Sequence, residues 1–288
     1  MSESPTSSKE ASNDSISQWT VVFEMMKEKG NITLLPGLSD KEFKAIEAKY
    51  KFTFPPDLRS FYQEHLPIGN GWINWRKPEI VEIEPDDQEL LNEVLQPPTY
   101  MNEVEINLYS IASGILFDIL NNDAWLSEFG EKPSSVKDAL VQAHRYLKSE
   151  NVPKLIPICT HRFIPSLPNE IGNPVFSIMG TDAIVYGYDL KQYLINELTD
   201  YTPCQKAPKW IPFWSSLCGE TQVVEDYWGS DDEENSEEKS EEENASKGEN
   251  KEVFENKDES SNKKDFNVDV LTQFGFGMKV IDEKEVKK

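Results

Sequence analysis

Apolar residues recur at helical spacing in six segments of the chain. The clearest is Ser135–Leu147, where every third or fourth residue is apolar. Ser39 and Glu42 form a capping box at the start of another segment, Pro55 opens a third, and Asp189 is a good N-cap for a fourth. Helices are therefore predicted over residues 16–29, 39–50, 55–68, 86–95, 135–147 and 189–198.

Short β-branched and aromatic stretches in the last third of this region predict strands. They are Leu155–Cys159, Pro174–Met179 and Ala183–Tyr188, and Gly180-Thr-Asp182 has the composition of a hairpin turn. Gly71–Lys77 has the pattern of a further strand, whereas Ile111–Leu120 fits a helix or a buried strand equally well. Helices that precede adjacent hairpin strands predict an α+β fold with an antiparallel sheet flanked by helices.

The charge divides the chain into three regions. The 288 residues carry 52 acids and 29 bases, a net charge of −23. Residues 229–288 alone hold 19 acids and 10 bases, and from Gly229 to Asp265 the only apolar side chains are Ala245, Val253 and Phe254. Such a segment cannot bury enough surface to offset the entropy of ordering its backbone. We expect a disordered N-terminus at 1–15, one folded domain at 16–228 and a disordered acidic tail at 229–288.

The same charge narrows the classes of partner. A chain this acidic repels nucleic-acid phosphates and anionic membranes, and its four arginines form no basic patch. The longest run free of charged residues, Ile106–Phe117, has twelve residues and is too short to span a bilayer. The N-terminus lacks the pattern of a signal peptide, and three widely spaced cysteines predict reduced thiols. These features predict a cytoplasmic protein, with the nucleus as an alternative, whose partner is a protein, a basic surface being one candidate.

No catalytic or cofactor-binding motif stands out. The nucleotide-binding, zinc-protease and serine-hydrolase patterns are missing, and no cofactor or metal is expected. His144 borders the apolar stripe of the 135–147 segment, where a structural role is favoured. Cys159 and His161 share one face of a strand end and could form a thiol–imidazole pair. Without an orienting group, a hydrolase built on that pair remains a minor alternative.

Two local features are candidate partner-binding sites. Residues 161–174, with His161, Arg162 and Asn173, are predicted to form a loop rich in proline and turn residues between two apolar strands. Arg162 there could bind a partner carboxylate, or it could hold the loop by bonding internal groups, which is favoured by two to one. Trp72 and Trp75 cannot both face the core along one regular strand, so we expect one to be partly exposed unless a bulge or a helix covers it. Asp182, in the hairpin turn, completes the set of candidate partner-binding residues.

Two stretches of the chain resemble the SUKH superfamily, the Smi/Knr-type regulators and bacterial toxin-immunity proteins. The first is SDKEFKAIEAKYKFTFPPDLRSFYQEHLPIGNGW. The second comprises GILFDILNNDAW and KLIPICTHRFIPSLPNEIGNPVFSIMGTDAIVYGYDLKQYLINE, whose HRFIP and GNPVFS elements are similar to a bacterial-type branch. The resemblance covers about residues 38–218.

This resemblance implies a single α+β domain and a non-catalytic role in binding protein partners. Bacterial members neutralise toxins, whereas eukaryotic members act as regulators or adaptor subunits, and the family supplies no agreed catalytic residues. The sixty-residue tail departs from the compact bacterial form and favours an intracellular regulator or adaptor. An immunity-type inhibitor of a basic toxin is the alternative.

The tail carries two further patterns. Ser230 and Ser240 each precede acids at the third position, typical of sites for acidophilic kinases, although the acids could equally serve solubility. Apolar residues alternate between Phe266 and Val280, which predicts a strand at 266–281 that docks on a sheet edge of this chain or of a partner. The alternative is an apolar but unstructured end.

Overall fold

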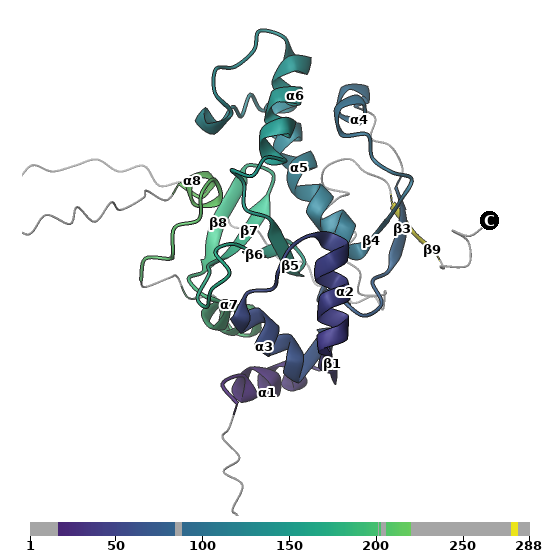
Figure 1. Cartoon of the computed structure of the whole chain (residues 1–288), viewed down its shortest axis with the longest axis vertical. Helices are drawn as coiled ribbons and strands as arrows, with labels where there is room; N and C mark the ends of the chain where they lie inside the picture. Colours follow the sequence, from purple (N-terminus) through teal and green to yellow (C-terminus); the bar gives the residue numbers. More distant parts are fainter. Residues whose placement is uncertain (1–16, 84–87, 201, 203–205, 220–277, 282–288) are drawn as a thin grey trace, which may run out of the picture. The chain divides into compact units, whose positions relative to one another are not determined.

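The protein has an α+β fold in which antiparallel sheets are flanked by helices (Figure 1). The computed structural model describes residues 17–83, 88–200, 202, 206–219 and 278–281. All of these belong to one compact unit, made of residues 1–221 and 265–288. The predicted fold class is confirmed.

Eight α-helices and nine strands make up the described part. The helices are α1 (Thr20–Lys29), α2 (Asp40–Tyr50), α3 (Pro56–Glu64), α4 (Glu89–Leu95), α5 (Glu103–Asn121), α6 (Val136–Leu147), α7 (Leu190–Leu198) and α8 (Trp214–Leu217), with a 3-10 turn η1 at Ser127–Phe129. The strands are β1 (Thr33–Pro36), β2 (His65–Ile68), β3 (Ile80–Ile83), β4 (Tyr100–Asn102), β5 (Leu155–Cys159), β6 (Arg162–Pro165), β7 (Val175–Met179), β8 (Asp182–Gly187) and β9 (Met278–Ile281).

The strands form three antiparallel sheets. The largest has the order β5-β6-β7-β8, so that each strand pairs with its neighbour in the chain. A second sheet pairs β1 with β2, and a third has the order β4-β3-β9. In the third sheet β9 pairs with β3 from Ile80↔Ile281 to Ile83↔Met278.

Alternate residues of the four-stranded sheet enter two different cores. Ile156 and Ile164 pair across β5 and β6 and face the core built on α1, α2, α3 and α7. Phe163 and Phe176 pair across β6 and β7 and face the core built on α4, α5, α6 and α8. Because side chains alternate along a strand, successive residues reach opposite faces of the sheet. Each face packs against one of these two groups of helices.

The predicted helices are confirmed where caps and apolar periodicity coincide. The Ser39–Glu42 capping box begins α2, the Ser135 hydroxyl accepts from the Asp138 N–H before α6, and Asp189 caps α7. The ambiguous segment 111–120 lies within α5. The end of the 55–68 helix was wrong, because α3 stops at Glu64 and the following residues form β2.

Two predictions for the middle of the chain were also wrong. Gly71–Lys77 is a series of turns, held by the N–H of Trp75 on the Ile73 carbonyl and the N–H of Lys77 on that of Asn74. Part of the predicted loop at 161–174 is the inner strand β6. Its proline, Pro165, stands at the strand end and therefore removes no inner ladder bond.

Candidate functional site

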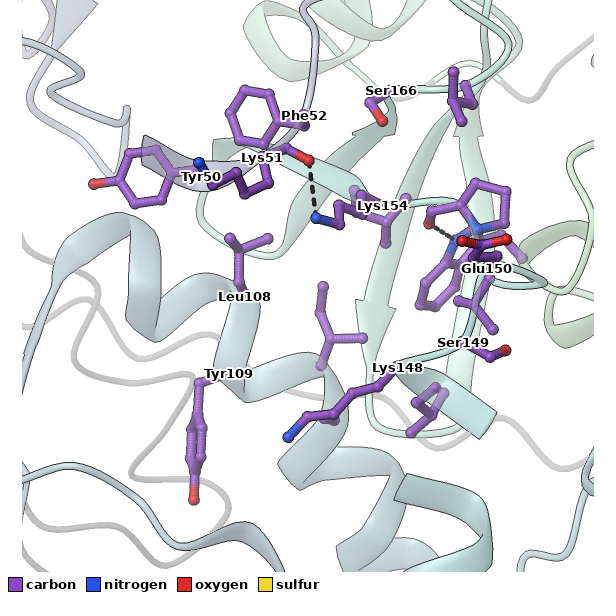
Figure 2. A pocket seen from close by; sticks show the side chains of 18 of the residues that line it. Tyr50, Lys51, Phe52, Leu108, Tyr109, Lys148, Ser149, Glu150, Lys154 and Ser166 are labelled. Atoms are coloured by element: carbon purple, nitrogen blue, oxygen red, sulfur yellow. Dashed lines mark hydrogen bonds between the residues drawn. The ribbon is translucent and has the colours of Figure 1, made fainter. Parts of the chain in front are cut away.

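The described part of the chain contains a large groove beside α5. Its volume is about 1240 Å³, and its lining comes from the end of α2, from α4, α5 and α6, from the segments before β5 and after β6, and from α8. Figure 2 shows α5 along one side and the end of α6 with the following segment along the other. The groove therefore lies where several helix ends meet and leave space unfilled.

Apolar side chains form the walls of this groove. α5 contributes Leu108, Ile111 and Ala112, which lie on one face because Ile111 and Ala112 follow Leu108 by three and four residues. The other apolar lining residues are Leu95, Leu147, Val152, Leu155 and Trp214. The Trp214 indole N–H donates to the Pro153 carbonyl at 2.6 Å, which fixes this wall.

Three lysines stand at the polar rim. Lys51 follows α2 in the left-handed conformation (φ 60°), and its carbonyl accepts a hydrogen bond from Lys154 Nζ at 2.8 Å (Figure 2). Lys148 follows α6 directly. Of the two acids in the lining, Glu47 already accepts the Phe54 N–H at 3.1 Å, whereas Glu150 is exposed. The rim thus has more cationic than anionic groups, although the chain as a whole is strongly acidic.

His144 and Ser149 add polar groups to the lining. Burial lowers the pKa of His144 below its usual value, and the Lys148 charge lowers it further. His144 is therefore neutral at pH 7. The Ser149 hydroxyl is buried, and no hydrogen-bond partner for it is found within residues 17–83, 88–200, 202, 206–219 and 278–281.

The tryptophans predicted as candidate contacts are buried. Trp72 is 2% exposed and Trp75 is 4% exposed. The prediction that one of the two indoles is partly exposed was therefore wrong. The physical reason is the turn structure of 71–77, which directs both rings into the same aromatic cluster with Phe54, Phe61 and Tyr62. This corresponds to the irregular backbone that the sequence left open as an alternative.

Arg162 makes internal contacts. Its Nη1 donates to the Ser177 hydroxyl at 2.8 Å, its Nε lies 3.5 Å from a carboxylate oxygen of Glu197, and its guanidinium carbon is 3.9 Å from the Tyr186 ring centroid. Burial raises the pKa of Glu197, and the charge of Arg162 partly offsets that rise. These contacts correspond to the favoured interpretation of Arg162 as an internal anchor.

Asn173 also has a structural environment. It is fully buried, and its amide donates to the carbonyls of Pro165 at 3.1 Å and Pro168 at 2.7 Å. The exposed Asp182 begins β8 after the two-residue turn at Gly180 and Thr181. Neither residue lines the groove, and their predicted role in partner binding remains a prediction.

Cys159 ends β5 and is buried, and His161 lies in the turn that follows and is partly buried. The Cys159 thiol, 1% exposed, lies 3.5 Å from the Asn70 carbonyl, and burial raises its pKa. Burial together with the Arg162 charge lowers the pKa of His161 to about 4. The thiol is therefore protonated and the imidazole neutral at pH 7.

Some candidates fall outside the described residues. Ser230 and Ser240 do so, as does the 266–277 part of the predicted docking strand, while 278–281 forms β9. In the portions that the structure covers, no three metal-ligating side chains come together, and no helix is both long and apolar enough to cross a membrane.

No family model, curated protein or solved structure matches this chain. The groove also escaped prediction from sequence, because its lining residues are spread from Glu47 to Trp214. Some lie on the apolar side of a helix, such as Leu108 on α5 and Leu147 on α6, and others lie in loops. Which of those sides pack fully and which leave a gap depends on how the elements meet in three dimensions.

Proposed function

We propose that this protein is a non-catalytic protein-binding module that acts as an intracellular regulator or adaptor. The resemblance of residues 38–218 to SUKH proteins supports this proposal, since those proteins bind protein partners. The composition of the chain supports a location in the cytoplasm, with the nucleus as an alternative compartment. The binding surface in this proposal is the groove beside α5.

The size of the groove is the observation that carries the proposal. A volume of about 1240 Å³ exceeds the range of roughly 300–1,000 Å³ that is typical of small-molecule pockets. Its walls are aliphatic and aromatic, and Leu167 at its edge is 56% exposed. An apolar groove of this size suits a peptide segment that places several side chains along it.

A photo-crosslinking experiment tests this proposal. Benzoylphenylalanine replaces Leu167 in the full-length chain, and in a matched control it replaces Val21, which is 64% exposed on α1 and does not line the groove. We expect ultraviolet irradiation in cells to yield a discrete protein adduct from position 167 alone. The added variant Ala112→Phe, which fills the groove from α5, should abolish that adduct, whereas Val21→Phe should not.

The same experiment can overturn the proposal. Adducts of equal yield at positions 167 and 21, or an adduct at 167 that survives Ala112→Phe, would show that the groove is not the binding surface. Circular dichroism of both phenylalanine variants verifies that each is folded.

A further inference from the structure

We infer that the groove recognises a partner segment that combines aliphatic side chains with carboxylates. This inference rests on the proposed function and names the chemistry of the partner. It is opposite to what the net charge of the chain alone indicates, because a chain at −23 attracts basic partners at long range.

The apolar walls of the groove define the aliphatic part of the ligand. Leu108, Ile111 and Ala112 run along α5, and Leu147 and Leu155 face them from α6 and β5. A single aliphatic side chain that leaves water gains roughly 1.5–3 kcal/mol. Two or three such side chains are needed to offset the cost of ordering a peptide segment, so the ligand must be apolar along several residues.

The lysines of the rim define the acidic part of the ligand. Lys51, Lys148 and Lys154 line the groove, and none of them forms an ion pair with an acid among the residues that the structure describes. The ammonium of Lys154 makes one hydrogen bond, to the Lys51 carbonyl, and therefore keeps donors for a ligand. Figure 2 shows Lys148 and Lys154 directed along the groove, with Glu150 on the far side of Lys154 from Tyr50. In this inference the ligand carboxylates bind the ammonium groups of Lys148 and Lys154, on the side away from Glu150.

The range of electrostatic forces decides whether the net charge of the chain or the lysines of the rim governs binding in the groove. At physiological salt the Debye length is about 8 Å, so charges farther away are largely screened. A segment seated in the groove therefore responds to the groups that line it, three lysines against Glu47 and Glu150, more than to acids elsewhere on the chain. Long-range attraction affects the rate of encounter with basic surfaces, whereas the groove selects acidic segments on contact.

A display selection tests the inference. The probe is a library of random 16-residue peptides on phage, selected against the full-length chain and depleted on the Ala112→Phe variant. We expect the enriched peptides to combine aliphatic residues with Asp or Glu. Enriched peptides that are neutral or basic would overturn the inference.

Lysine variants test the same point with one selected peptide. Reversal of charge by Lys154→Glu or Lys148→Glu should weaken its affinity about tenfold each, and Lys154→Met, which keeps the apolar stem, about threefold. Lys191→Glu is the matched control, because Lys191 is exposed on α7 and does not line the groove. Equal losses for Lys191→Glu and Lys154→Glu would show a general charge effect and overturn the inference.

The two failures are distinguishable. Groove-dependent peptides without acids would leave the protein-binding proposal intact and remove only the acidic ligand. A selection that yields no peptide sensitive to Ala112→Phe, together with no groove-dependent adduct from position 167, would remove both.

Discussion

Glu103 is a carboxyl at the first turn of α5 that is only 6% exposed. Burial raises its pKa from 4.5 to about 7, and a hydrogen bond from the Asn74 N–H at 3.4 Å only partly opposes that rise. The folded state therefore binds this proton more tightly than the unfolded state does. Its contribution to stability is full below about pH 4.5 and is lost as the pH rises through about 7.

Glu103→Gln should remove this pH dependence. At pH 8 the variant should be more stable than the parent chain by up to about 3 kcal/mol, since one pKa unit corresponds to about 1.36 kcal/mol. At pH 4.5 the two chains should differ little. Urea unfolding of both proteins at the two pH values measures this, and the comparison cancels the opposite slope from His161, whose lowered pKa weakens the fold as the pH falls from 6.5 toward 4. A constant difference between the chains would contradict the assignment.

Arg162 gives a second prediction at the scale of the residue. Arg162→Gln leaves the Glu197 carboxylate buried without its cation and should lower the free energy of unfolding by about 3 kcal/mol. The double variant Arg162→Gln/Glu197→Gln should recover part of that loss, because no unpaired charge remains. Arg145→Gln, on the exposed face of α6, is the control and should change stability by less than about 0.5 kcal/mol. Additive effects of the two substitutions would argue against an internal ion pair.

At the scale of elements, the pairing of β9 with β3 makes a directional prediction. The Ile83 N–H donates toward β4, to the Thr99 carbonyl at 2.8 Å. Because N–H groups alternate in direction along a strand, the Glu82 N–H points toward β9. Removal of residues 278–288 should therefore accelerate hydrogen exchange of the Glu82 amide, while the Ile83 amide changes less. Equal acceleration of both amides in an NMR exchange experiment would mean that the whole sheet depends on β9.

The elements that could be predicted from sequence are those in which local signals agree. α2, α6 and α7 have a capping side chain and an apolar stripe, and the turn at Gly180 joins two strands with clear apolar content. The strands β1, β2, β3 and β4 have only three or four residues each, too few for a period of two to be recognised. Their conformation depends on pairing partners that lie far away in the sequence.

At the scale of the whole molecule, the candidate site depends on packing that no local pattern encodes. Trp72 and Trp75 were chosen as contacts on the basis of a regular strand, and the turns at 71–77 place both in the core. Arg162 carries a charge that a sequence can show, but its partners Ser177, Tyr186 and Glu197 come from β7, β8 and α7. The groove is still harder to predict from the sequence, because it is a space between elements.

The arrangement of the two cores predicts how the whole domain unfolds. Leu58 belongs to the core on one face of the four-stranded sheet and Leu140 to the core on the other, and both are fully buried. Adjacent residues of β6, Phe163 and Ile164, enter opposite cores. Neither core can therefore lose its packing without disturbing the strand that supports the other, and the described domain should unfold as one cooperative unit.

Leu140→Ala tests this coupling. The substitution should lower the free energy of unfolding by about 2–5 kcal/mol. It should reduce the hydrogen-exchange protection of the most protected amides in α3 as much as in α6. Leu58→Ala is the reciprocal variant and should produce the same pair of losses. Protection lost only in the helix that carries the substitution would mean that the two faces of the sheet unfold separately, because the alternation of β6 would then transmit no stability between them.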